Sequence, residues 1–373
     1  MLSYGFSIRG KSHESSGNVC QDANAYLQVT PDLYLAIAAD GVGSALHSDI
    51  ASGLAVEKLT EYIKRNISSN TSVEAQKKCL KAGFRYADEA IQRYVYDCRD
   101  NINDYDTTLH AVLYDGKTLV YGHAGDGGIL ARTNHGTTFC VTNPQKGSDG
   151  VSVMPLRAGA SSWEFGCIPE EVTSVLLVTD GILERVILPY LLNLPANRQQ
   201  MQDIKRKKNN VYLSATEFFM NPYCVMGNRK IKDPLKVYQY FLTGEFKDFE
   251  QDWDFYVDCL KSGYRNMYGS NKANEICETI TASVPLWNIE DTTDDKTAVC
   301  LINESAVIHP PAKEYFMEPN WPDLRKHYED LMYPSGIHED DESQHPDSEA
   351  SFDRKKSSKK KSGGFFRKLF REK

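Results

Sequence analysis

Nearly continuous apolar runs recur through the first 185 residues, separated by short polar breaks. Residues 33–39 (LYLAIAA) form one such run, which is typical of a strand covered on both faces. Residues 108–114 and 118–123 predict two more strands, joined at Asp115-Gly116, a dipeptide that favours a hairpin turn. This part of the chain therefore predicts strands with buried faces, connected by tight turns.

Two stretches instead repeat apolar residues at helical spacing. A helix is expected from Ser44 or Ser48 onward, and its apolar face is expected to consist mostly of Ile50, Leu54, Val56, Leu59 and Ile63. A second helix is expected across 73–96, with an apolar face made by Leu80, Phe84, Ala87, Ile91 and Val95. Two helices thus follow the first buried strand.

Four aspartates stand next to short apolar runs: Asp22, Asp40, Asp180 and Asp294. Asp40 follows the run at 33–39, and Asp180 follows the run SVLLVT. A carboxylate is costly to bury alone, because its lost hydration is compensated only by a partner or a metal ion. Hard divalent cations prefer oxygen ligands. The pattern predicts a metal-dependent hydrolase.

Composition is that of a globular protein and excludes some functions. Hydrophobic residues make up 41% and charged residues 25% of the 373 residues. The net charge of −8 and the lack of a basic stripe in the core argue against a nucleic-acid substrate, and so against a nuclease. No apolar run in the sequence is long enough to span a bilayer. The nine cysteines include no Cys-x-x-Cys pair, which favours reduced thiols and a cytoplasmic location.

Residues 186–285 show a different, mixed and mostly helical pattern. A further strand, 297–302, comes only after them, so this stretch is expected to be a subdomain inserted into the core. It is either a structural cap over one end of the core or a lid or docking surface near a site. Position in the chain does not decide between them.

The end of the chain predicts two further segments. Residues 304–353 are expected to form an acidic, disordered linker, because residues 337–353 offer little apolar surface to bury. Residues 354–373 carry ten Lys and Arg against one Glu, and their apolar residues would share one helical face. This basic tail resembles a weak anchor for anionic lipid. A solubilising tail folded onto the acidic segment and a docking peptide for a protein are the alternatives.

Five motifs, in order, resemble the protein phosphatase 2C family of metal-dependent serine/threonine phosphatases, and its bacterial-type branch most. They are Gln21-Asp22-Ala23, Asp40-Gly41-Val42-Gly43-Ser44, Gly125-Asp126-Gly127, Thr179-Asp180-Gly181 and Asp294-Asp295-Lys296-Thr297. The resemblance covers about 1–185 and 290–303. It implies an α+β fold, a four-layer α-β-β-α sandwich of two antiparallel sheets, within a catalytic domain of residues 1–303 that has the helical insertion before its last motif.

The resemblance also implies a centre of two Mg²⁺ or Mn²⁺ ions. Asp40 would bridge both ions, and the Gly41 carbonyl would bind one of them. Asp180 and Asp294 would complete the other ion. Asp294 is preferred to its neighbour Asp295, because the family has Asp-Asn at this motif.

Two further aspartates are implied at the edge of this centre. Asp22 would hold water bound to the metal, and Asp126 would help to bind a third, weaker ion. Asp22, Asp40, Asp180 and Asp294 are therefore the expected catalytic residues. Two cations about 4 Å apart lower the pKa of a bridging water, so that a hydroxide can attack phosphorus without a phosphoenzyme.

The expected substrates are phosphoserine and phosphothreonine proteins, with a cognate kinase or its targets as partners. Two departures from the family motivate an alternative, a catalytically weak module that binds phosphoproteins. Gly17 stands where many members have a phosphate-binding arginine, and Val42 stands where many have a histidine proposed as general acid. The residues considered as substitutes are Arg9, Lys11, His13, His47 and His123.

Overall fold

The computed structural model describes residues 1–147, 152–186, 219–220, 275, 278, 281–282 and 293–309. Most of the 186–285 insertion lies outside these residues. The greater part of the predicted linker at 304–353 and the whole basic tail at 354–373 also lie outside them. Among the described residues, no helix combines the length and the apolar character that a membrane span requires.

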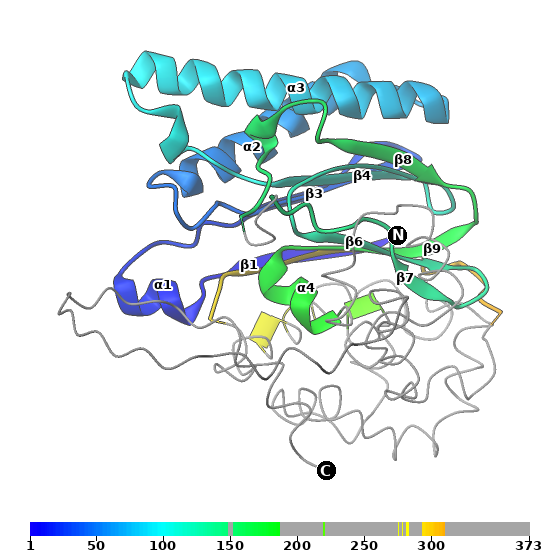
Figure 1. Cartoon of the computed structure of the whole chain (residues 1–373). Helices are drawn as coiled ribbons and strands as arrows, with labels where there is room; N and C mark the ends of the chain where they lie inside the picture. Colours follow the sequence, from blue (N-terminus) through cyan, green and yellow to red (C-terminus); the bar gives the residue numbers. More distant parts are fainter. Residues whose placement is uncertain are drawn as a thin grey trace, which may run out of the picture. The chain divides into compact units, whose positions relative to one another are not determined.

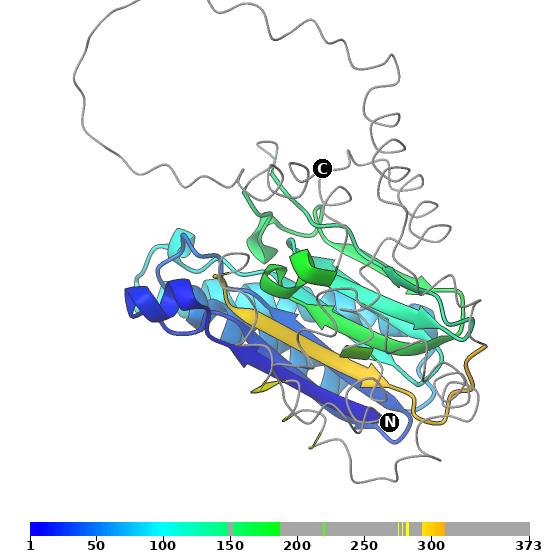
Figure 2. The ribbon, with the colours of Figure 1, turned by 90° about the horizontal axis from the view of Figure 1, so that it is seen from below.

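Two five-stranded antiparallel sheets form the centre of the molecule. The first has the order β1 (Leu2–Ile8), β10 (Lys296–Ile302), β9 (Val172–Val178), β6 (Gly128–Thr133) and β7 (Thr138–Cys140). The second has the order β2 (Ala23–Thr30), β3 (Leu33–Ala39), β4 (Leu109–Tyr114), β5 (Leu119–Ala124) and β8 (Glu164–Ile168). The strand at 297–302 is thus an inner strand, between β1 and β9 (Figure 2).

Helices cover the sandwich. The long helices α2 (Ser48–Asn66) and α3 (Val73–Cys98) lie over the second sheet, and α4 (Asp180–Val186) lies against β9 and β10 on the other side (Figure 1). Three other helical segments within residues 1–186 are short: α1 (Lys11–Ser16), η1 (Ile102–Asp104) and η2 (Leu156–Ala158). The predicted α+β fold with two antiparallel sheets is confirmed.

Strand β3 has the bounds that its apolar run predicted, and it is buried on both faces. Leu35 and Ile37 pack in the core beneath the helices, whereas Ala36 and Ala38 face the core between the sheets. The small alanines allow the sheets to approach, and the larger residues fill the space below α2 and α3. A continuous apolar run was therefore the correct signal for this strand.

The apolar face predicted for the first helix was incomplete. Helix α2 begins at Ser48, and Ile50 and Leu54 are only half-buried. The fully buried stripe includes the small residues Ala51 and Ala55. The reason is close packing against β2, β3 and α3, which large side chains would prevent.

Helix α3 matches its prediction. All five of its predicted apolar residues are buried. The helix begins after Ser72, whose Oγ accepts a hydrogen bond from the Ala75 N–H at 3.3 Å. At Gly83 an added Cβ would lie 2.6 Å from the Leu59 side chain of α2, so glycine permits the close contact of the two helices.

Candidate metal centre

The register of the strands brings four distant acidic segments to the same end of the sandwich. In the first sheet, Val178 at the end of β9 pairs with Gly128 at the start of β6 and with Ala298 near the start of β10. Asp126, Asp180 and Asp294, each two residues beyond a strand end, therefore all lie at this end of the sheet. Asp40 follows β3 of the second sheet, so both sheets contribute.

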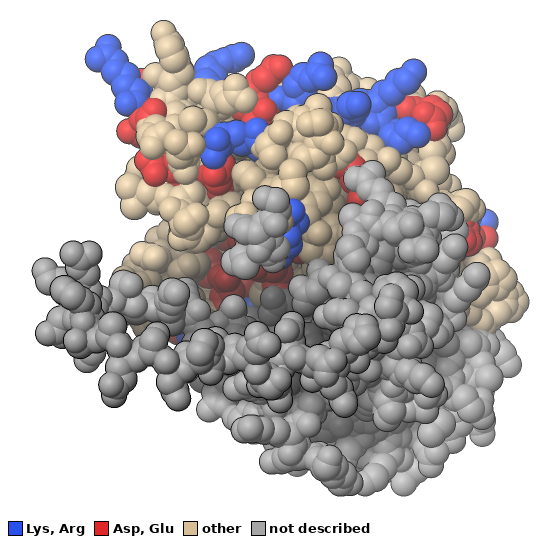
Figure 3. All heavy atoms as spheres, in the orientation of Figure 1, with Lys and Arg blue, Asp and Glu red and all other residues tan. Residues whose placement is uncertain are grey.

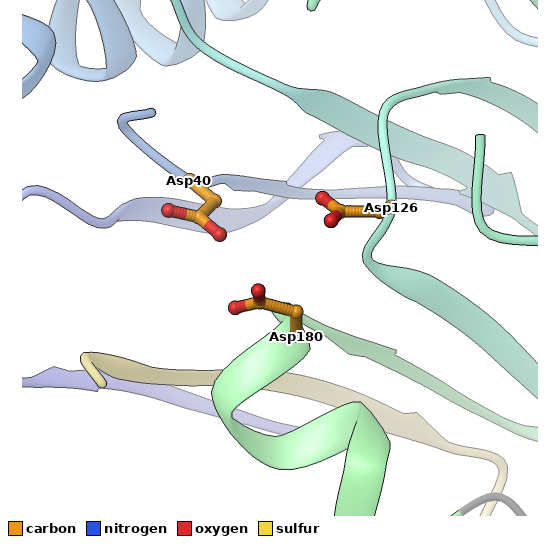
Figure 4. A group of neighbouring side chains, drawn as sticks. All are labelled: Asp40, Asp126 and Asp180. Atoms are coloured by element: carbon orange, nitrogen blue, oxygen red, sulfur yellow. The ribbon is translucent and has the colours of Figure 1, made fainter. Parts of the chain in front are cut away.

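Asp40, Asp126 and Asp180 point toward one another (Figure 4). One carboxylate oxygen from each lies within 4.8 Å of the others. Together with Asp294, they line a cleft of about 430 Å³. Figure 3 shows acidic atoms in a hollow on this face of the molecule. Carboxylate oxygens in this arrangement are a donor set that suits Mg²⁺ or Mn²⁺.

The environment of these carboxylates makes their negative charge costly. Burial raises the pKa of Asp40 well above its ordinary value, and the neighbouring charges, Asp180 first, raise it further. Burial also raises the pKa of Asp180, with Asp126 as the largest of its repelling neighbours. A divalent cation would relieve both effects, since it attracts the charges that now repel one another.

Asp22 is buried and is not among the described residues that line the cleft. Its Oδ2 accepts a hydrogen bond from the Thr179 hydroxyl at 2.8 Å, and Thr179 Oγ1 in turn accepts one from the Thr297 N–H at 3.1 Å. Burial raises the pKa of Asp22 to about 7. Asp22 is thus held beside the residue that precedes Asp180.

The two neighbours Asp294 and Asp295 have different surroundings. Asp294 lines the cleft. Asp295 is buried, and its carboxylate accepts hydrogen bonds from the Gly10 and Gln21 N–H groups, each at 2.6 Å. These hydrogen bonds join the N-terminal part of the chain to the segment before β10, and they use both carboxylate oxygens of Asp295. The geometry therefore favours Asp294 as the ligand.

Gly41 is fixed at a point of close backbone approach beside Asp40. Its N–H donates to the Gln21 carbonyl at 3.1 Å. An added Cβ would lie 2.7 Å from that oxygen and 2.8 Å from the Ser48 carbonyl. A side chain at this position would therefore displace the loop that follows Asp40.

The residues considered as substitutes for the missing arginine and histidine lie elsewhere. Gly17 ends α1 with a φ of +77°, a left-handed conformation that an arginine would adopt only with strain. Val42 lines the cleft, whereas none of the candidate substitutes is among the described lining residues. Of the histidines, His13 lies 2.9 Å from Asp295, His47 packs against Tyr105, and His123 is buried against His110.

Sequence reasoning missed Lys146. This lysine lines the cleft, and its ammonium group forms an ion pair with Asp126. Its sequence context, a polar loop at 143–147, resembles any solvated turn. A search for basic residues near the Gly125-Asp126-Gly127 motif in the chain would not have found it, because 20 residues separate the partners.

One family model and several solved structures match this chain. The family model described as protein phosphatase 2C matches residues 9–212, more than half of the chain. Among curated proteins, none matches this sequence. The similar solved structures include a bacterial serine phosphatase, with 12% identity, a TM-score of 0.46, and 82% of this chain and 98% of the other covered.

Two further similar structures have comparable values. The serine/threonine phosphatase Stp1 from Staphylococcus aureus is 12% identical, with a TM-score of 0.44 and coverage of 81% and 95%. The catalytic domain of the serine threonine protein phosphatase PstP, in complex with 2 manganese ions, is 13% identical, with a TM-score of 0.41 and coverage of 80% and 96%. Membership follows from the family model: the chain belongs to the protein phosphatase 2C family.

Proposed function

We propose that this protein is a Mg²⁺- or Mn²⁺-dependent phosphatase that hydrolyses phosphoserine and phosphothreonine in proteins. Family membership supports a serine/threonine phosphatase. The observation that carries the metal dependence is the group of Asp40, Asp126 and Asp180, with oxygens within 4.8 Å of one another in a cleft. Mutual repulsion among clustered carboxylates is expected where a cation is to be bound.

Four groups are proposed to hold the two ions: the carboxylates of Asp40, Asp180 and Asp294 and the Gly41 carbonyl. Asp126 borders the same space. When bound, the ions supply Lewis acidity, which lowers the pKa of water and offsets charge on the phosphoryl oxygens.

The chain's own residues fit direct attack by water. Cys20 is close to Asp22 in the sequence, but burial raises the pKa of its thiol to about 12. Such a thiol is a poor nucleophile at neutral pH, because the thiolate is the reactive form. No phosphorylated enzyme residue is needed, and Asp22, oriented by Thr179, is proposed to hold a water molecule at the edge of the carboxylate cluster.

Val42 in the cleft predicts a preference among leaving groups. Hydrolysis of an aryl phosphate releases a phenolate, a leaving group that needs little protonation. The alkoxide released from phosphoserine or phosphothreonine needs a proton. We propose that alkyl ester hydrolysis is the slower reaction here, because an apolar residue stands where a general acid would donate.

The biological setting proposed for this activity is a cytoplasmic one that opposes a protein kinase. The substrates would be phosphoproteins, including the kinase itself or its targets. The basic tail, 354–373, is proposed to bring the enzyme to anionic membrane surfaces, since basic residues beside apolar ones favour such lipids.

The test is hydrolysis of p-nitrophenyl phosphate and of a phosphothreonine peptide, each with Mn²⁺ and with EDTA. We expect turnover of both substrates with Mn²⁺ and none with EDTA. Asp180→Asn should abolish turnover, while the control Asp97→Asn, on the exposed face of α3, should retain it.

Two results would change the proposal. Turnover of the aryl ester alone would show a working metal centre without proton donation to alkyl leaving groups. No turnover of either substrate, in a folded protein that still binds Mn²⁺, would favour a module that binds phosphoproteins.

A further inference from the structure

Lys146 is the only basic residue among the described residues that line the cleft. Five of the others are aspartates: Asp40, Asp106, Asp126, Asp180 and Asp294. The Lys146 ammonium forms an ion pair with Asp126, whose side chain is only 6% exposed. A positive charge thus lies at one corner of the carboxylate cluster.

Hydrogen bonds of the preceding residues position this lysine beside Asp126. Gln145 makes two hydrogen bonds with Gly125, since its N–H donates to the Gly125 carbonyl at 2.8 Å and its Oε1 accepts from the Gly125 N–H at 3.1 Å. The residues that follow, Lys146 and Asp126, are therefore held side by side. An antiparallel bridge between Lys146 and Val153 secures the other side of the loop.

This arrangement differs from a chance surface pair. An exposed lysine samples many positions, and its pair with a carboxylate contributes little. Here the partner carboxylate is buried, and the loop that carries the lysine is joined to the turn that carries the aspartate. Asp126 also lies within 4.8 Å of Asp40 and Asp180, so the ammonium lowers the repulsion in the whole cluster.

Resting on the proposed function, we propose that Lys146 is a built-in cation of this centre. Its ammonium neutralises Asp126 and occupies the space that a third, weaker metal ion would need. Asp126 then serves the two proposed ions as a neutralised neighbour, and the protein binds two divalent ions where an unblocked centre would bind three.

The experiment counts bound Mn²⁺ by equilibrium dialysis of the full chain, followed by elemental analysis. We expect two ions in the wild type and three in Lys146→Met, with the added ion the weakest. Asp126→Asn in the Lys146→Met background should return the count to two. Lys58→Met is the matched control, because Lys58 also pairs with carboxylates but lies on α2 outside the cleft, and it should bind two.

A second variant, Lys146→Gln, keeps a polar side chain and guards against a folding defect in Lys146→Met. It should also bind three ions. An equal count in the wild type and both Lys146 variants would overturn the inference, whether that count is two or three. If inorganic phosphate then inhibited the variants more weakly than the wild type, Lys146 would be a phosphate-binding group instead.

The same measurements distinguish a failure of the proposed function from a failure of the role proposed for Lys146. A wild type that binds no Mn²⁺ would overturn the metal-dependent phosphatase, and the inference with it. A wild type that binds three ions and hydrolyses phosphate esters would leave the phosphatase in place and overturn the role of Lys146 alone.

Discussion

Two acidic regions lie close together in this molecule, and they are built in opposite ways. In the cleft, Asp40, Asp126 and Asp180 face one another. One residue beyond Asp294, Asp295 instead accepts hydrogen bonds from the Gly10 and Gln21 N–H groups and lies 2.9 Å from His13 Nδ1. The first region concentrates negative charge, whereas in the second region hydrogen-bond donors of the protein surround a single carboxylate.

The comparison teaches that burial alone does not assign a role to a carboxylate. Asp295 stabilises the fold, because protein donors replace the water that it loses. Asp40 and Asp180 destabilise the metal-free fold, because their nearest charged neighbours are also acidic. Such a cost in stability is common at functional sites.

Asp40→Asn should have the largest effect and should act in opposite directions on rate and stability. Loss of a ligand worth several kcal/mol of transition-state stabilisation should lower Mn²⁺-dependent turnover by about 10³-fold. The pKa of Asp40 is raised in the fold, so its ionisation at neutral pH costs the metal-free protein free energy that asparagine avoids. Thermal unfolding in EDTA should therefore show a higher Tm for the variant.

For this substitution, Asp97→Asn is again the control and should change neither rate nor Tm. A lower Tm in EDTA for Asp40→Asn would contradict the view that the cleft is a region of net repulsion.

Asp295→Ala should destabilise the protein, by about 3 kcal/mol, because two buried N–H groups lose their acceptor. Urea unfolding measures this loss. Asp295→Asn keeps one acceptor oxygen and should fall between the wild type and the alanine variant. Equal stability of all three proteins would remove the contrast between the two acidic regions.

The buried histidine pair extends the contrast to a basic group. Burial, and then His123, hold the pKa of His110 well below its ordinary value, so His110 is neutral in the fold. The unfolded chain takes up a proton below about pH 6.5, and stability should therefore fall as the pH drops, by about 1.4 kcal/mol per pH unit.

Urea unfolding of the wild type and His110→Gln between pH 7.5 and pH 5.5 isolates this group. The carboxylates titrate in both proteins, so their contribution cancels in the difference. Parallel pH profiles for the two proteins would contradict a lowered pKa of His110 in the fold.

The smallest effect is expected for Glu74→Gln at the surface. Glu74 pairs with Lys77 at 2.8 Å in the first turn of α3, where both groups are solvated. The Tm should not change measurably, because water and salt screen such a pair. A clear loss would show that exposed charges contribute to stability as buried ones do.

The sequence by itself determined several of the strands, the two long helices and the identity of the acidic segments. A continuous apolar run located β3, which is buried on both faces, and apolar residues at helical spacing located α3. Helical spacing left Ala51 and Ala55 out of the face of α2, since the burial of small residues depends on how closely other elements approach. The resemblance in five short motifs named the family that the family model confirms.

Only the tertiary structure decided which charges meet. Antiparallel register places Asp126, Asp180 and Asp294 at one end of the sandwich, and the packing of the second sheet adds Asp40. The tertiary structure also gives the adjacent residues Asp294 and Asp295 different surroundings, and it joins Lys146 to Asp126, 20 residues away in the sequence. Periodicity reports on burial within one element, whereas the energy of a charge depends on neighbours that arrive from other parts of the chain.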